Sequence, residues 1–84
     1  MSFTPEFTPD AQSQWKASDF ELQELVLEEL DRLAADPPGA SKCVADFVCE
    51  RADARHYVFM QIEVDRPRHI VKVVGVAQYT RPKD

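Results

Sequence analysis

Apolar residues in the first half of the chain recur at helical spacing. Between residues 20 and 35 they follow one another at steps of three and four: Leu22, Leu25, Val26, Leu30, Leu33 and Ala34. This period places them on one stripe of a helix. Ser18 and Glu21 fit a capping box at its start, and the segment from Asp36 to Gly39 ends it. On the polar face, Glu28 and Arg32 are spaced for an i,i+4 ion pair.

A shorter helix is predicted before it. Thr8 is suited to the N-cap and Pro9 to the first helical position, and the helix is expected to run to about Lys16. Residues 1 to 7 form either a strand, with Phe3 and Phe7 facing inward, or an extended arm. Since proline cannot donate a ladder hydrogen bond, Pro5 restricts any such strand to the edge of a sheet.

In the second half of the chain the period changes to two. Residues 42 to 50, 56 to 64 and 69 to 79 alternate or run as β-branched stretches typical of strands, and residues 65 to 68 form a turn. The β-branched run from 70 to 76 predicts a central strand buried on both faces. The expected order of elements is therefore strand, helix, helix, strand, strand, strand.

These elements predict one α+β domain over residues 1 to 84. Two N-terminal helices should pack on one face of a three- to four-stranded antiparallel sheet and leave the other face open. The 84 residues are 44% hydrophobic and 30% charged, which is the composition of a single globular domain. Because a chain of this size buries only roughly 60 to 65% of its surface, association with a second copy or a partner is expected.

The net charge of −5 conceals an asymmetry. Residues 1 to 50 carry three basic and eleven acidic side chains, whereas residues 51 to 84 carry seven basic and four acidic ones. An acidic protein repels nucleic acid at long range, but a local basic face can still bind phosphate. The charge distribution therefore leaves RNA binding by the C-terminal half open.

Two cysteines, Cys43 and Cys49, lie on the same predicted strand. They should be roughly 20 Å apart at about 3.3 Å per residue, too far for a disulfide within one chain. We expect free buried thiols, as a reducing compartment permits. No metal-ligand motif, cofactor motif or apolar run of about 18 residues occurs, so the sequence predicts a cytoplasmic protein without metal, cofactor or membrane span.

Candidate chemistry lies in the last third of the chain. If the last two strands form a hairpin, its open end should bring together Arg55, His56, Tyr79 and Arg81. Arginines with a tyrosine and a histidine could hold a phosphodiester, stack on a base and transfer protons during RNA cleavage by the ribose 2′-hydroxyl. The alternative interpretation is that these are ordinary solvated strand ends. Arg51 and Lys72 are further candidates for nucleic-acid binding.

Several stretches resemble the RelE/ParE superfamily of toxin–antitoxin toxins: Phe7-Thr8-Pro9-Asp10-Ala11, Leu30-Asp31-Arg32-Leu33-Ala34-Ala35-Asp36-Pro37, and the paired strands 56 to 64 and 69 to 76. The resemblance covers nearly the whole chain. It implies a small antitoxin-like partner and either ribosome-dependent messenger-RNA cleavage or poisoning of gyrase. It also implies basic site positions near Arg51 and Arg55, and an arginine near Tyr79 or Arg81. Residues 52 to 54 replace the loop glycine usual in the superfamily, which implies a degenerate site.

Two classes of function follow. The first is a toxin that cleaves RNA or inhibits gyrase, using Arg51, Arg55 and Arg81 on phosphate. The second is a non-catalytic interaction domain that binds a protein partner or itself through the open sheet face. For this second class Tyr57 and Phe59 are the expected contact residues.

Overall fold

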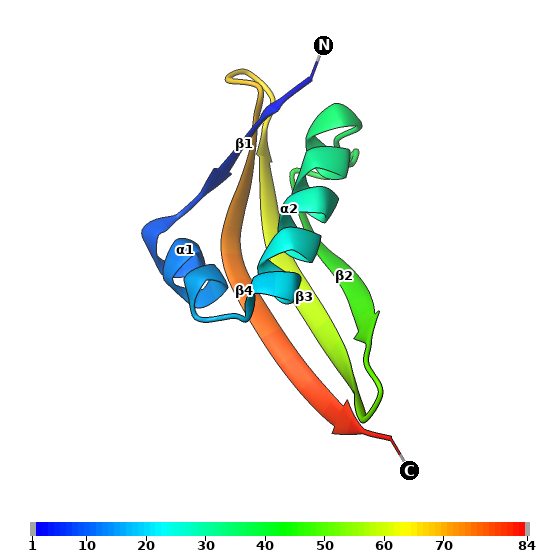
Figure 1. Ribbon diagram of the computed structural model, residues 1–84. Coiled ribbons are helices and arrows are strands. Elements are labelled where there is room, and N and C mark those ends of the chain that lie inside the picture. Colours follow the sequence, from blue (N-terminus) through cyan, green and yellow to red (C-terminus); the bar gives the residue numbers. More distant parts are fainter. Residues whose placement is uncertain (1, 84) are drawn as a thin grey trace.

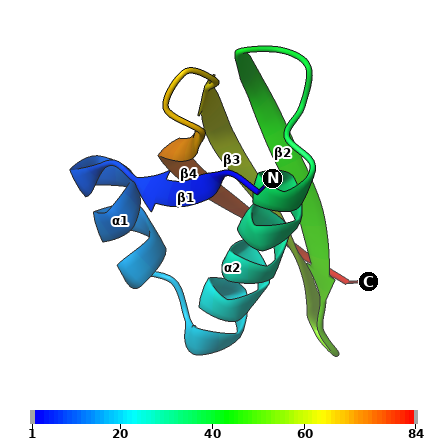
Figure 2. The same cartoon turned by 90° about the horizontal axis from the view of Figure 1, so that it is seen from above.

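The computed structural model describes residues 2–83. Its elements, in chain order, are β1 (Thr4–Phe7), α1 (Pro9–Lys16), α2 (Phe20–Ala35), β2 (Lys42–Glu50), β3 (Ala54–Asp65) and β4 (Ile70–Pro82). Figure 1 shows the two helices together on one side of a single twisted sheet, and Figure 2 shows the same layering from above. The predicted α+β class and order of elements are confirmed.

The sheet has the strand order β1-β4-β3-β2. The last three strands pair antiparallel, as expected, whereas β1 pairs parallel to β4, so the whole sheet is mixed. Of the two alternatives for the N-terminal segment, the edge strand forms over Thr4–Phe7; residue 1 lies outside the described part of the chain. Pro5 is tolerated there because an edge strand has one side without ladder bonds.

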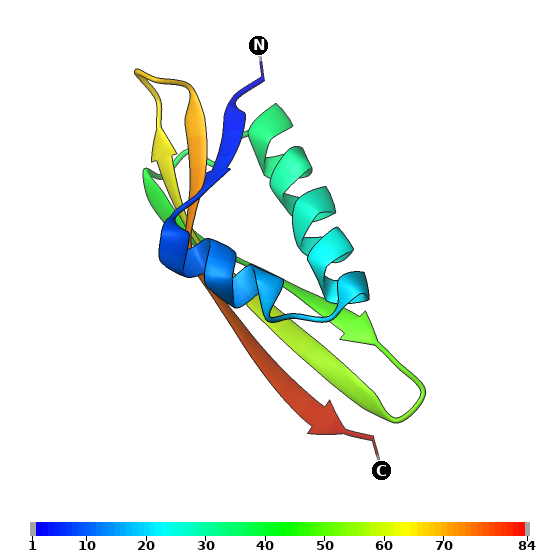
Figure 3. The ribbon, with the colours of Figure 1, turned by 60° about the vertical axis from the view of Figure 1, so that its left-hand side comes forward.

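The hairpin of β3 and β4 is longer than the strands predicted over residues 56 to 64 and 69 to 79. β3 begins at Ala54, and β4 continues to Pro82 because the two residues pair with each other. At the other end, His69 belongs to the turn, with φ of 56°. β1 flanks β4 only over Ile70–Val73, so β4 is a central strand in its first part alone. The rest of the hairpin extends past the helices, as Figure 3 shows.

The core lies between the helices and the inner face of the sheet. Its largest fully buried side chains are Leu22, Val26, Leu30, Val58, Met60, Ile62, Val71 and Val73. On β3 the even-numbered residues from 58 to 64 are buried, and the odd-numbered ones face the other side of the sheet. Burial on one face and exposure on the other is what alternation along an antiparallel strand produces. The outer face remains uncovered by any element of residues 2–83.

Both helix starts are capped, one of them at a different residue from the predicted one. Thr8 caps α1, since its Oγ1 accepts a hydrogen bond from Ala11 N at 3.2 Å. At α2 the cap is Asp19, not Ser18: Asp19 Oδ1 accepts from Leu22 N at 3.0 Å. Aspartate and serine are both good caps, so the pattern did not distinguish neighbouring positions.

Two further polar contacts define the helix layer. Arg32 pairs with Glu29 rather than with Glu28, which replaces the expected i,i+4 spacing by i,i+3. Gln14 in α1 reaches the edge of β4, where its side-chain oxygen accepts a hydrogen bond from Val76 N at 2.7 Å. The outer edge of β4 is thus covered partly by β1 and partly by this side chain.

Truncation of the core stripe should destabilise the fold strongly. Leu30→Ala removes a side chain that is 2% exposed and leaves a cavity, so the free energy of unfolding should fall by about 2–5 kcal/mol. Leu27→Ala on the same helix is the matched control, because Leu27 is 41% exposed and its loss should cost less than about 1 kcal/mol. Urea unfolding followed by circular dichroism measures both; equal losses would contradict the assigned stripe.

Candidate functional site

Two rows of side chains lie next to each other at the open end of the β3–β4 hairpin. Tyr57 stands opposite Tyr79, and Arg55 stands opposite Arg81. Directly opposite residues of an antiparallel pair project from the same face, which here is the outer one. The two tyrosine rings are 6.0 Å apart between centroids and tilted by 44°. With Lys83, these four residues form what we call the arginine–tyrosine cluster.

A cavity of about 390 Å³ lies within this cluster, lined by Arg55, Tyr57, Arg81, Pro82 and Lys83. Three of its five lining residues are cationic. Tyr79 beside it is 57% exposed. A planar base or a phosphate group can therefore reach both the cations and the aromatic rings from solvent.

Neither Lys83 in this cluster nor Glu50 beside it, at the end of β2, was predicted from the sequence. The Glu50 carboxylate contacts Arg55 Nε at 2.7 Å and Lys83 Nζ at 2.9 Å. The Lys83 ammonium group, followed by Arg55, holds the pKa of Glu50 below its ordinary value. In the structure Glu50 and Arg55 are paired across the short connection between β2 and β3. The signal in the sequence was the two opposite charges on either side of that connection.

Arg51 does not join the cluster. Its guanidinium lies on the helix side of the sheet, where it contacts Asp19 at 2.9 Å and Glu21 at 3.5 Å. The hydrogen bond that Arg51 donates to Asp19 raises the pKa of Arg51 above its ordinary value. Its Nε is buried without a hydrogen-bond partner among residues 2–83. With two carboxylates beside it, Arg51 is a structural ion-pair residue here; its nucleic-acid role stays a prediction.

His56 also lies apart from the arginines. Because adjacent residues of a strand point to opposite faces, His56 projects toward the helix side while Arg55 and Tyr57 project outward. There its Nδ1 is 3.1 Å from the hydroxyl oxygen of Thr80. The expectation that four residues would meet at one edge is therefore corrected to three: Arg55, Tyr79 and Arg81. A catalytic role for His56 stays a prediction.

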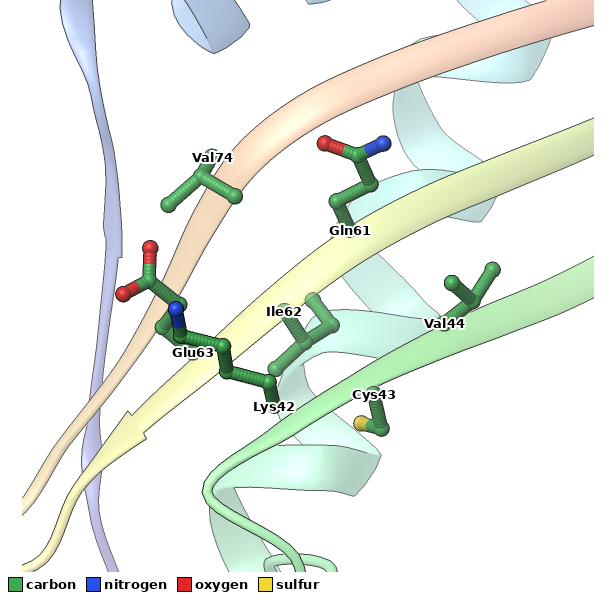
Figure 4. A pocket seen from close by; sticks show the side chains of 7 residues that line it. All are labelled: Lys42, Cys43, Val44, Gln61, Ile62, Glu63 and Val74. Atoms are coloured by element: carbon green, nitrogen blue, oxygen red, sulfur yellow. The ribbon is translucent and has the colours of Figure 1, made fainter.

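The rest of the outer face carries more apolar side chains, among them Val44, Val48 and Phe59. Phe59, next to Tyr57 on that face, is 38% exposed. A second cavity of about 470 Å³ spans β2, β3 and β4 and is lined by Lys42, Cys43, Val44, Gln61, Ile62, Glu63 and Val74, which Figure 4 shows. Lys72 stands opposite Glu63, roughly 26 Å along β3 from Arg55 at about 3.3 Å per residue. Lys72 is thus not part of the arginine–tyrosine cluster, and its binding role stays a prediction.

The two cysteines are both free thiols, as predicted, but only Cys49 is buried and Cys43 is half-buried. Cys49 is buried on the helix side and its Sγ lies 3.4 Å from Glu21 Oε1. Burial raises the pKa of the Cys49 thiol. Within residues 2–83 no three His, Cys, Asp or Glu side chains are grouped to hold a metal ion. No helix in that range is long and apolar enough to cross a membrane.

Comparison of the sequence with protein-family models gives no match, and comparison with curated proteins gives none either. Comparison of the fold does find similar structures. The Escherichia coli toxin RelE, as a double arginine-to-alanine mutant in the free state, superposes with a TM-score of 0.71 at 16% identity, covering 92% of this chain and 83% of that one.

Two toxin–antitoxin complexes contain similar chains. The intact Escherichia coli RelBE complex gives a TM-score of 0.68 at 16% identity, with 95% of this chain and all of that chain covered. A RelBE complex from Mycobacterium tuberculosis gives 0.65 at 16% identity, with 94% and 93% covered. This chain therefore has the fold of RelE toxins, which the sequence resemblance had implied.

The ion pair that holds Arg51 should make stability depend on pH. The hydrogen bond from Leu22 N, the largest cause, and Arg51 lower the pKa of Asp19 from 3.8. A carboxyl with a lowered pKa in the folded state stabilises above its unfolded pKa and loses this contribution as the pH falls through its folded pKa. Wild type should therefore be more stable than Asp19→Asn near pH 6, and the difference should shrink below about pH 3.8.

Thermal unfolding from pH 6 to pH 2 measures this difference. Asn can still cap α2, so the substitution removes the charge while keeping the cap. Asp31→Asn, an exposed aspartate on the same helix, is the matched control and should show little change at either pH. A pH-independent difference at Asp19 would contradict the assignment.

Proposed function

We propose that this chain is a RelE-like toxin that binds single-stranded RNA at the arginine–tyrosine cluster and is held inactive by a small antitoxin-like protein. The observation that carries the proposal is the pair of adjacent rows, Tyr57 with Tyr79 and Arg55 with Arg81, beside a cavity of about 390 Å³ that Arg55, Tyr57 and Arg81 line. Guanidinium groups bind phosphate through paired N–H donors, and tyrosine rings stack on unpaired bases. The two rows together match one phosphate and its neighbouring bases.

Cleavage at this site would use the ribose 2′-hydroxyl as nucleophile. Its oxygen attacks the adjacent phosphorus, the bond to the 5′-oxygen breaks, and one proton moves from the nucleophile while another reaches the leaving oxygen. Arg55 and Arg81 would stabilise the charge that develops on the phosphate oxygens. The Tyr79 hydroxyl is the proposed proton-transfer group at the cluster, since His56 projects from the opposite face. RNA in the cytoplasm is the proposed target.

A protein partner is supported by a different part of the same face. The similar chains of known structure include members of RelBE toxin–antitoxin complexes. On this chain Val44 is 61% exposed, Val48 48% and Phe59 38%, all on the outer face. Exposed apolar side chains gathered on one face mark protein-binding surfaces. The second candidate function, a non-catalytic interaction domain, depends on this surface alone.

Induced expression tests the toxin proposal directly. Expression of the wild type without a partner should arrest growth, and Arg55→Ala with Arg81→Ala should relieve the arrest because the phosphate contacts are lost. Arg66→Ala with Arg68→Ala removes the same charge from the turn at the opposite end of the hairpin and should not relieve it. Absence of arrest by folded wild-type protein would leave the non-catalytic interaction domain as the function.

Binding to a short single-stranded RNA separates stacking from chemistry. Tyr79→Ala should weaken binding roughly 5- to 150-fold, because one base–aromatic stack is lost. Tyr79→Phe should retain the affinity and lose cleavage. Arg81→Ala should reduce the slope of log affinity against log salt by about 0.7, which one phosphate contact contributes on a single strand. Fluorescence anisotropy and gel assays of the same RNA measure both effects; unchanged affinity in Tyr79→Ala would contradict the site.

A further inference from the structure

The outer edge of β2 has no neighbour within residues 2–83. β2 is the last strand of the sheet, and its nine residues pair with β3 in one continuous register. The opposite edge of the sheet is partly covered, because β1 pairs with the start of β4 and the Gln14 side chain accepts a hydrogen bond from Val76 N beyond it. Within the described part of the chain, the β2 edge is therefore uncovered along its whole length, whereas the opposite edge is uncovered only beyond Val76.

The hydrogen-bonding groups that β2 presents outward can be assigned. Ser41 O accepts from Val64 N at 2.8 Å, and Arg51 N donates to Ala54 O at 3.0 Å. Odd-numbered residues at both ends thus bond toward β3. In an antiparallel ladder the bonding direction alternates, so the N–H and C=O groups of the even-numbered residues point away from β3. These residues are Lys42, Val44, Asp46, Val48 and Glu50.

Natural edge strands are usually protected by proline, bulges, charged side chains or short length, and of these β2 has only the charges of Lys42, Asp46 and Glu50. β2 has neither a proline nor a register shift against β3. Its apolar side chains are also incompletely covered on both faces: Val44 and Val48 on the outer face are about half exposed or more. Cys43, Ala45 and Phe47 on the helix side are only half-buried. A further strand placed along this edge would cover both sets.

We propose that two copies of this chain associate through their β2 strands, antiparallel about a twofold axis at Asp46. The facing pairs are then Lys42 with Glu50, Cys43 with Cys49, Val44 with Val48, and Ala45 with Phe47, each occurring twice. The outward backbone groups of the even-numbered residues bond to their counterparts in the second copy. The partner is a second copy because the strand is complementary to its own reverse in charge and in apolar character.

This register is distinguished from its neighbours. The outward N–H and C=O groups stay paired only if even-numbered residues face even-numbered residues. The neighbouring registers are therefore shifted by two residues in either direction. One places Val44 opposite Asp46 and Val48 opposite Lys42; the other places Val44 opposite Glu50 and Val48 opposite Asp46. Each sets valines against charges, whereas the register centred on Asp46 pairs valine with valine and lysine with glutamate. Its one unfavourable contact is Asp46 opposite Asp46 of the second copy.

The dimer is one continuous sheet with the helices of both copies on the same side. The outer faces join, so both arginine–tyrosine clusters remain open to solvent. Glu50, which already holds Arg55 and Lys83, gains Lys42 of the second copy as a neighbour. The association does not depend on the proposed RNA binding.

The native cysteines provide a register-specific test. Cys43 and Cys49 of the second copy form a non-hydrogen-bonded pair, for which the Cα atoms are about 4.5 Å apart. This separation lies within the range of disulfides. Diamide oxidation of purified protein, at mildly alkaline pH because the buried Cys49 thiol ionises late, should give a dimer on a non-reducing gel. Mass spectrometry should find the Cys43–Cys49 linkage between chains.

Single cysteine variants are the controls. Cys43→Ser and Cys49→Ser should each give no cross-linked dimer alone, because every proposed bond needs one cysteine of each kind. An equimolar mixture of the two variants should give a dimer with a single disulfide. Cross-linked dimers in either variant alone, or monomer in both the wild type and the mixture, would overturn the proposal.

Sedimentation without oxidant tests the same interface in a second way. Val44→Lys should reduce association at least tenfold while the chain stays folded, since Val44 is 61% exposed. Asp46→Asn should strengthen association roughly two- to fivefold by removing the like-charge contact. Ala77→Lys, in the middle of the outer face, should have no effect. If Ala77→Lys abolishes association and Val44→Lys does not, the copies meet face to face and the edge proposal is wrong.

Discussion

The antiparallel ladder between β3 and β4 is the constraint on which the rest of the structure depends. It runs from Ala54 opposite Pro82 to Asp65 opposite Ile70, and it carries the inner face that both helices cover. Side chains alternate between faces along each strand, so a slip by one residue would turn the buried valines outward and the arginines inward. Core and candidate site are therefore fixed by one register, and they lie on opposite faces of the same two strands.

A single irregularity in that ladder sets which residues of β4 face outward. The register shifts between Gln61 and Ile62, where Val74 is the additional residue on β4. Before it, odd-numbered Val71 and Val73 point to the core; after it, Val76 does. The bulge thus reverses the alternation, and Tyr79 and Arg81 come to share the outer face with Tyr57 and Arg55. Without this extra residue, the two tyrosines would lie on opposite faces.

Carboxylates decide how the basic residues of the C-terminal half are used. Asp19, the N-cap of α2, and Glu21 in its first turn hold Arg51 against the helix layer. Glu50 holds Arg55 and Lys83 on the outer face. The Arg51 ion pairs join residues about 30 positions apart in the chain, whereas the Glu50–Arg55 pair spans the short β2–β3 connection. The acidic N-terminal half is thus more than a solubilising surface, because its carboxylates fix Arg51 at the helix layer and position Arg55 and Lys83 on the outer face.

The sequence by itself determined the order of elements, the α+β class, the buried stripe of α2 and the pairing of the last strands. These follow from local periodicity and capping, which act between residues close in the chain. Only the tertiary structure decided that β1 runs parallel beside β4, that a bulge brings Tyr79 and Arg81 to the face of Tyr57 and Arg55, and that Arg51 lies away from Arg55. Each of these depends on strand order, on a bulge or on a distant carboxylate. Such contacts leave no periodic signal, because they join residues whose separation along the chain is unrelated to their distance in space.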